Sequence, residues 1–129
     1  MSQQFKIEII SPDKSIFSGE TEEVVLPCYE GQVTVLKDHI PLITFLRPGL
    51  VKIFNEDEKT FFVEEGTVEF ANNNLLILTS SAVELPSKNK QSLVSLLSEA
   101  EKQIISEEIT DKEKYLLSYK IETLKSITR

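Results

Sequence analysis

Short apolar runs separated by turn residues fill the first two thirds of the chain. Phe5, Ile7 and Ile9 alternate with polar residues, which is the period of two expected of a strand with one buried face. Other apolar runs are continuous, and such runs suit strands packed on both faces or strands at a corner of a sheet. These continuous runs lie at residues 24–26, 50–51, 61–63 and 75–78.

Turn residues separate these runs at short intervals. Pro12-Asp13 pre-sets a turn, and the asparagines at 72–74 tolerate the left-handed backbone of a hairpin loop. Many short strands with regular turn signals indicate an all-β sandwich or barrel. Residues 1–86 are therefore predicted to form an N-terminal β-sandwich domain.

The apolar period becomes helical after Pro86, and no further Pro or Gly follows. Thr110 and Glu113 have the spacing of a capping box, which predicts the start of a second helix. Residues 87–129 should thus form an antiparallel two-helix hairpin, giving an α+β protein. The residues predicted to line the packing faces of the two helices are Leu93, Leu96, Leu97, Ala100, Ile104, Leu117, Ile121 and Leu124.

Composition and charge narrow the classes of partner. The chain of 129 residues suits one domain, or one domain with a small appendage. Its net charge is −7, and residues 1–86 hold fourteen acidic but only six basic side chains, which argues against nucleic acid and anionic membranes as partners. No apolar run approaches the roughly 20 residues of a membrane-spanning helix, so no direct membrane insertion is expected. The first residues also lack the pattern of a secretory or transit segment.

The sequence offers little for catalysis or metal binding. It has no glycine-rich phosphate loop, no Gly-x-Ser-x-Gly and no second histidine beside His39. A catalytic histidine needs a positioned partner, so a structural or interfacial role is favoured for His39. Cys28, the single cysteine, is interpreted as a small residue at a strand end. The acidic run at 55–59 lacks the ligand alternation of a calcium loop and is interpreted as a solvated hairpin tip. We predict no enzyme, no cofactor and no metal.

Residues 30–49 string turn residues and apolar strands in an uncommon order, Glu-Gly-x-x-x-Val-Leu-x-x-His-x-Pro-Leu-x-Thr-x-Leu-x-Pro-Gly. This order resembles the rotor-facing segment of the F-type ATP synthase epsilon subunit. The likeness also takes in residues 5–19, 62–66 and 75–79, so about residues 4–84 are covered. Cys28 stands where glycine is common in the family, and Lys37-Asp38 replaces the usual Pro-Gly or Pro-Asn. We expect this chain to differ most from its relatives at Lys37-Asp38.

The resemblance implies a flattened sandwich of about ten short strands followed by a helical hairpin. It also implies a noncatalytic central-stalk subunit of a proton-translocating ATP synthase, peripheral on the cytoplasmic side of the bacterial inner membrane. The partners it implies are the gamma subunit and the polar loops of the c-ring. Among the interface candidates, the resemblance implies that Glu30, Gly31, Gln32 and His39 lie close to the c-ring, with Ile40, Pro41 and Leu42 beside them.

A second role implied by the resemblance is regulation, in which the hairpin contacts the alpha and beta subunits and inhibits ATP hydrolysis. Residues 111–129 hold five basic and three acidic side chains, so this is a weaker hypothesis than rotor coupling. The place of the family's ATP-sensing motif, residues 88–93, has neither Arg nor Ala, which does not support ATP binding. The alternative function is a free-standing β-sandwich that binds a ligand, sugar or peptide. It would predict an exposed aromatic cluster, but the chain has no Trp.

Overall fold

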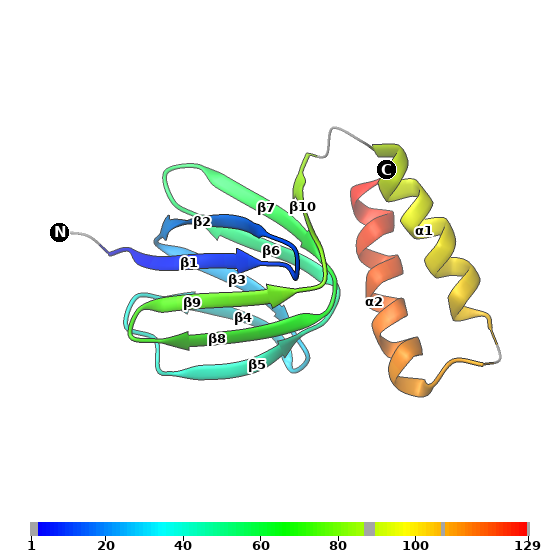
Figure 1. Ribbon diagram of the computed structural model, residues 1–129, viewed down its shortest axis with the longest axis horizontal. Helices are drawn as coiled ribbons and strands as arrows, with labels where there is room; N and C mark the ends of the chain where they lie inside the picture. The colour runs from blue at the N-terminus through cyan, green and yellow to red at the C-terminus, as the bar shows by residue number, and fades with distance from the viewer. Residues whose placement is uncertain (1–2, 87–89, 107, 129) are drawn as a thin grey trace. The chain divides into compact units, whose positions relative to one another are not determined.

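The computed structural model describes residues 3–86, 90–106 and 108–128, and in this part the chain forms ten strands and two helices (Figure 1). Two compact units, Met1–Leu85 and Pro86–Arg129, make up the chain and are described separately. The predicted β-sandwich of about ten strands and the predicted C-terminal helices are confirmed. Residues 87–89 lie outside the described residues. The predicted second domain begins at residue 87, and the segment compared with the ATP-sensing motif begins at residue 88.

The strands of the first unit are four to seven residues long, as expected for a small sandwich. They are β1 (Phe5–Ile10), β2 (Ser15–Thr21), β3 (Glu23–Cys28), β4 (Gly31–Leu36), β5 (Leu42–Leu46), β6 (Gly49–Phe54), β7 (Glu58–Val63), β8 (Gly66–Ala71), β9 (Asn74–Thr79) and β10 (Ala82–Leu85).

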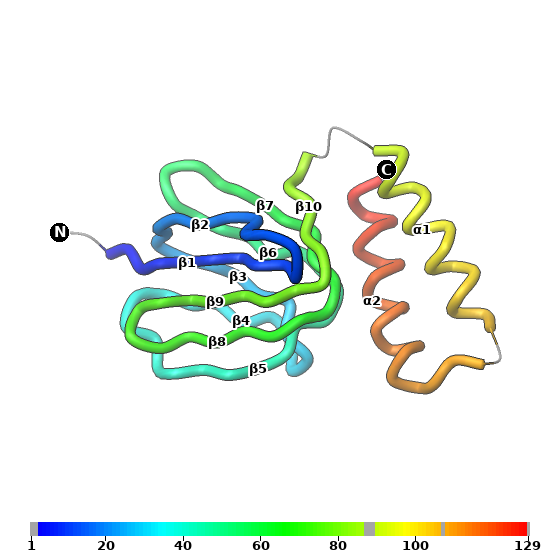
Figure 2. Tube along the Cα trace, viewed as in Figure 1, coloured from blue at the N-terminus to red at the C-terminus, as the bar shows by residue number. Residues whose placement is uncertain are grey.

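These strands form one hydrogen-bonded sheet that folds into two layers. Strands β4, β3, β6, β7 and β10 form one layer, and β5, β8, β9, β1 and β2 form the other. The single pair Cys28–Leu46 joins β3 to β5, where the sheet passes between layers. Strands β1 and β9 pair in parallel, and Figure 2 shows these two segments, far apart in the sequence, side by side. All other pairs are antiparallel.

The core lies between the two layers and is built from alternate strand residues. Phe5, Ile7 and Ile9 are buried in it, as their alternation predicts, and the Phe5 ring packs edge-on against the Phe70 ring at 5.5 Å. The prediction that runs 24–26 and 75–78 are packed on both faces is wrong, because alternate residues in these runs are partly or largely exposed. Each layer packs on the other through one face only along these strands. Run 61–63, by contrast, is buried throughout.

Three turns take the form that their residues predict. Ser11 and Lys14 exchange backbone hydrogen bonds of 2.9 and 3.3 Å around Pro12-Asp13. Asn72 and Asn73 have φ angles of 52° and 58° in the β8–β9 turn, which is the left-handed backbone that asparagine tolerates. Residues 55–59 are exposed at the β6–β7 hairpin tip.

The second unit contains α1 (Lys90–Ile104) and α2 (Asp111–Ile127), which run in opposite directions (Figure 1). The predicted capping box is present: the Thr110 hydroxyl accepts from the Glu113 backbone N–H at 3.1 Å, and Glu113 accepts from the Thr110 N–H at 3.5 Å. Neither helix is long and apolar enough to span a membrane. Of the predicted packing residues, Leu93, Ala100 and Leu124 are buried; Leu96, Leu97, Ile104, Leu117 and Ile121 are half-buried.

Candidate functional site

The turn between β3 and β4 carries the first group of predicted interface residues. Gly31 has a φ of 129°, a backbone conformation that favours glycine. Glu30 is exposed, and its carboxylate accepts hydrogen bonds of 2.8 and 3.1 Å from the hydroxyl of Thr44 on β5, a residue only 6% exposed. Glu30 therefore holds the turn to β5, a role that the sequence did not reveal. Gln32 is exposed on β4.

Cys28 ends β3 next to this turn and is fully buried, as predicted for a small residue at a strand end. Burial and, to a smaller extent, the negative charge of Glu30 raise the pKa of its thiol to about 11, although the positive charge of Arg47 opposes the rise. The thiol therefore stays protonated and unreactive near neutral pH. Within the described residues, no group of three His, Cys, Asp or Glu side chains is placed to hold a metal ion.

The connection between β4 and β5 carries the second group. The His39 backbone N–H donates to the Leu36 carbonyl at 3.1 Å, and its imidazole meets the Phe70 ring edge-on at 5.9 Å. The Nδ1 atom of His39 lies 2.7 Å from the carbonyl oxygen of Ile40. These contacts fix the position of the His39 side chain. The neighbouring Ile40 side chain is 75% exposed.

The structure does not bring the two groups together. Glu30 and Gly31 lie at the start of β4, and His39 to Leu42 follow its other end. Because Gly31 and Leu36 are five strand steps of about 3.3 Å apart, the backbone of Gly31 lies roughly 17 Å from the end of β4 that His39 follows. The predicted interface residues thus form two patches at opposite ends of the sandwich.

Strand β5 joins the two ends and exposes apolar side chains. Leu42, Thr44 and Leu46 face the core, with Leu46 fully buried, whereas Ile43 is 81% and Phe45 60% exposed. The outer face of an antiparallel strand is usually polar, so the exposed Ile43 and Phe45 depart from that pattern. The Tyr29 ring lies 6.1 Å from the Phe45 ring, at the β3–β4 end. In the sequence, Thr44 interrupts an apolar run, but the run does not show which side chains face outward, so this surface was missed.

Further apolar side chains lie on the outer side of the same layer, beyond the exposed Thr67. Phe45 pairs with Thr67 on β8, Thr67 with Leu78 on β9, and Leu78 with Ile10 on β1. Leu78 is 44% exposed and Ile10 is half-buried. We call Ile10, Ile43, Phe45 and Leu78 the apolar outer face. Exposed apolar patches are common where proteins contact one another.

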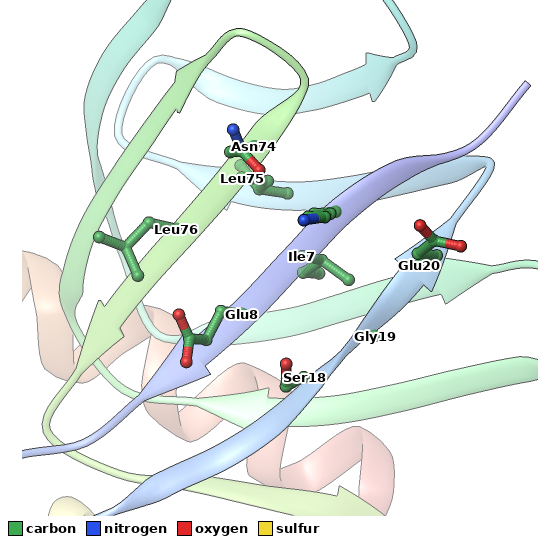
Figure 3. A pocket seen from close by; sticks show the side chains of 9 residues that line it. Ile7, Glu8, Ser18, Gly19, Glu20, Asn74, Leu75 and Leu76 are labelled. Atoms are coloured by element: carbon green, nitrogen blue, oxygen red, sulfur yellow. The ribbon is translucent and has the colours of Figure 1, made fainter.

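Two hollows lie on the outer side of this layer. One, of about 600 Å³, is lined by Ile10, Pro12 and Leu78 among others and so belongs to the apolar outer face. The other, of about 550 Å³, spans β9, β1 and β2. Figure 3 shows Glu8 there between Leu76 and Ser18, and Lys6 and Glu20 also line it. The first hollow is suited to an apolar side chain, whereas the second has a charged lining.

Residues 4–85, which hold this whole site, match the family model described as the beta-sandwich domain of the ATP synthase delta/epsilon chain. The ATP synthase epsilon chain of Pelagibacter ubique (strain HTCC1062) is 47% identical over 129 residues, covering 98% of this chain and 99% of the relative. The chain belongs to the ATP synthase epsilon chain family. Another family member, from Dichelobacter nodosus (strain VCS1703A), is 34% identical over 82% of this chain and 76% of its own length.

The fold of the chain described here is also found in solved ATP synthase structures. A chain of the Euglena gracilis mitochondrial ATP synthase structure with OSCP, F1 and c-ring superposes with a TM-score of 0.73 at 19% identity, covering 97% of this chain and 79% of that one. A chain from the central stalk and c-ring structure of the Tetrahymena thermophila mitochondrial ATP synthase gives 0.68 at 16% identity, covering 96% of both chains. The agreement extends over both the strands and the helices.

Proposed function

We propose that this chain is the noncatalytic central-stalk subunit of a proton-translocating F-type ATP synthase. The observation that carries the proposal is the family match over residues 4–85, together with 47% identity to an epsilon chain over nearly the whole sequence. In this role the subunit joins the gamma subunit to the c-ring, so that torque from proton flow reaches the catalytic head. It performs no chemistry of its own.

Contact with the gamma subunit is assigned to the apolar outer face and to the adjoining His39, Ile40, Pro41 and Leu42. Ile40, Ile43 and Phe45 are each more than half exposed, and burying such side chains against a partner supplies much of the binding free energy of an interface. The neighbouring hollow would accept an apolar side chain of the partner.

Contact with the c-ring is assigned to the β3–β4 turn, with Glu30, Gly31 and Gln32. Glu30 and Gln32 are exposed and polar, which suits the polar loops that the resemblance implies for the ring. Glu30 contributes by holding the turn through Thr44, and Gln32 is the side chain available for direct hydrogen bonds. The separation of this turn from His39 lets one sandwich contact two partners at once.

We assign residues 1–86 and 87–129 to two separate domains. The second, helical domain is assigned a regulatory role, in which it contacts the alpha and beta subunits and inhibits ATP hydrolysis; this role has less support than rotor coupling. The core of the sandwich is built entirely from residues of the first unit, so a chain ending at residue 86 is expected to fold. ATP hydrolysis by enzyme assembled with the full or the shortened chain tests the role. Equal rates would remove inhibition by the hairpin.

The location that follows is peripheral, on the cytoplasmic side of a bacterial inner membrane, within the ATP synthase. Purification of a tagged chain from detergent-solubilised membranes tests both location and function. We expect the gamma subunit, the catalytic head and the c-ring to copurify in fixed ratio. Recovery of the chain alone, or mainly with proteins that are not ATP synthase subunits, would refute the proposal.

A further inference from the structure

The β4–β5 loop and the β8–β9 turn are joined by a reciprocal pair of hydrogen bonds. The Asp38 backbone N–H donates to Asn73 Oδ1 at 2.7 Å, and Asn73 Nδ2 donates to Asp38 Oδ1 at 2.9 Å. The two residues are 35 positions apart in the sequence. Both distances are within the range of good hydrogen bonds, so the Asn73 side chain binds both the backbone and the carboxylate of Asp38.

The backbone at this junction is unusual. Every non-glycine residue with a positive φ in the described part of the chain lies here: Asp38 at 66°, Asn72 at 52° and Asn73 at 58°. Left-handed conformations of non-glycine residues persist where the surrounding structure holds them, and they gather at functional sites. The two side-chain bonds provide such support for Asp38.

The loop that Asp38 supports presents Ile40. Packing does little to hold that side chain, because 75% of its surface is exposed. Its position therefore depends on the backbone of the loop, which is tied at Asp38 by the bonds to Asn73 and at His39 by the N–H bond to Leu36 and the ring contact with Phe70.

We propose that Asp38 and Asn73 are positioning residues: together they form a clasp that holds the β4–β5 loop so that Ile40 is ready to contact the partner subunit. The assignment of the partner rests on the function proposed above. Asp38 and Asn73 act through the loop and need not touch the partner. A loop held in its bound conformation before binding loses less conformational entropy when the complex forms.

Three variants distinguish the effect of the side-chain hydrogen bonds from the effect of the left-handed backbone. Asp38→Gly and Asn73→Gly each permit a positive φ but remove a side chain of the clasp. The exchange Asp38→Asn with Asn73→Asp restores both bonds, because a carboxylate at position 73 accepts from the backbone N–H and from the amide at position 38. Gln4→Ala is the matched control, since it removes another exposed side-chain hydrogen bond, to Asn55 at 3.0 Å.

Trypsin cleavage after Lys37 in the folded protein reports opening of the loop. We expect Asn73→Gly, which loses both hydrogen bonds, to be cleaved about tenfold faster. Asp38→Gly keeps its backbone N–H and loses only the bond from Asn73 Nδ2, so its cleavage should be about threefold faster. The double glycine variant should be cleaved no more than about twofold faster than Asn73→Gly, because both bonds of the clasp use the Asn73 side chain. The exchange should return cleavage to the original rate, and Gln4→Ala should leave it unchanged.

The affinity of each variant for ATP synthase from which this subunit has been removed shows whether the clasp positions Ile40 for binding. The glycine variants should bind several-fold more weakly and the exchanged variant normally. Unchanged cleavage in the glycine variants would overturn the clasp, and faster cleavage with unchanged affinity would overturn its positioning role. Failure of the unmodified chain to bind the stripped enzyme would instead refute the proposed function, while the cleavage rates would still test the clasp.

Discussion

Replacing Phe45 by threonine should weaken assembly with the ATP synthase while leaving the fold almost unchanged. Phe45 is 60% exposed, and a phenylalanine presents about 200 Å² in total, so roughly 120 Å² remains for a partner to bury. At about 25 cal/mol per Å² this area corresponds to ~3 kcal/mol, or about a hundredfold in Kd, as an upper bound. Threonine keeps the preference for a strand, and loss of the Tyr29 contact should lower the free energy of unfolding by no more than ~1 kcal/mol.

The assay is a titration of stripped ATP synthase with the tagged chain, combined with urea unfolding of the free chain. Leu36→Thr is the matched control, because Leu36 is 50% exposed on β4, in the other layer. The control should bind within about twofold of the original chain. A Phe45→Thr chain that binds within about threefold of the original, or no more weakly than the control, would refute the assignment of the apolar outer face.

Three further predictions concern stability. Because the folded state holds the pKa of Cys28 near 11, above its ordinary value of 9.0, the unfolded chain ionises first as pH rises. The free energy of unfolding should therefore be unaffected by this thiol below pH 9 and fall by about 2 to 3 kcal/mol between pH 9 and 11. Urea unfolding of Cys28→Ala, which lacks that decline, checks it. Gly66→Ala should destabilise the sandwich by about 3 kcal/mol or more, because the new Cβ would lie 2.1 Å from the Leu78 carbonyl oxygen. Gly19→Ala, whose nearest contact would be a ring atom at 3.4 Å, should change thermal unfolding far less. Thr110→Ala should cost about 1 kcal/mol and reduce helicity measured by circular dichroism, and Thr110→Ser should retain most of the cap.

Local patterns predicted the elements well because each depends on residues close in sequence. The alternation of Phe5, Ile7 and Ile9 defines one buried face, and the capping box needs only Thr110 and Glu113. Continuous apolar runs were less informative. Run 75–78 is apolar throughout, yet Leu78 is 44% exposed, because the packing of a layer on one face cannot be deduced from a run with no alternation.

The candidate site was predictable only in part. The segment 30–49 identified the family, but its resemblance grouped Gly31 with His39, and the length of β4 separates them. The apolar outer face combines β5 with β8, β9 and β1, and its membership depends on strand order. That order is set by pairings between distant segments, which no local period encodes.

By itself, then, the sequence determined the family, the short strands, the two helices and the turn residues, since these follow from periodicity, caps and a long shared segment. The number of about ten strands came from the resemblance to the family. Only the tertiary structure decided that Glu30 bonds Thr44, that Asp38 bonds Asn73, and that the apolar side chains of β5 face outward. The physical reason is that hydrogen bonding and burial depend on which distant strands become neighbours. Those neighbours are chosen when the two layers close around their common core.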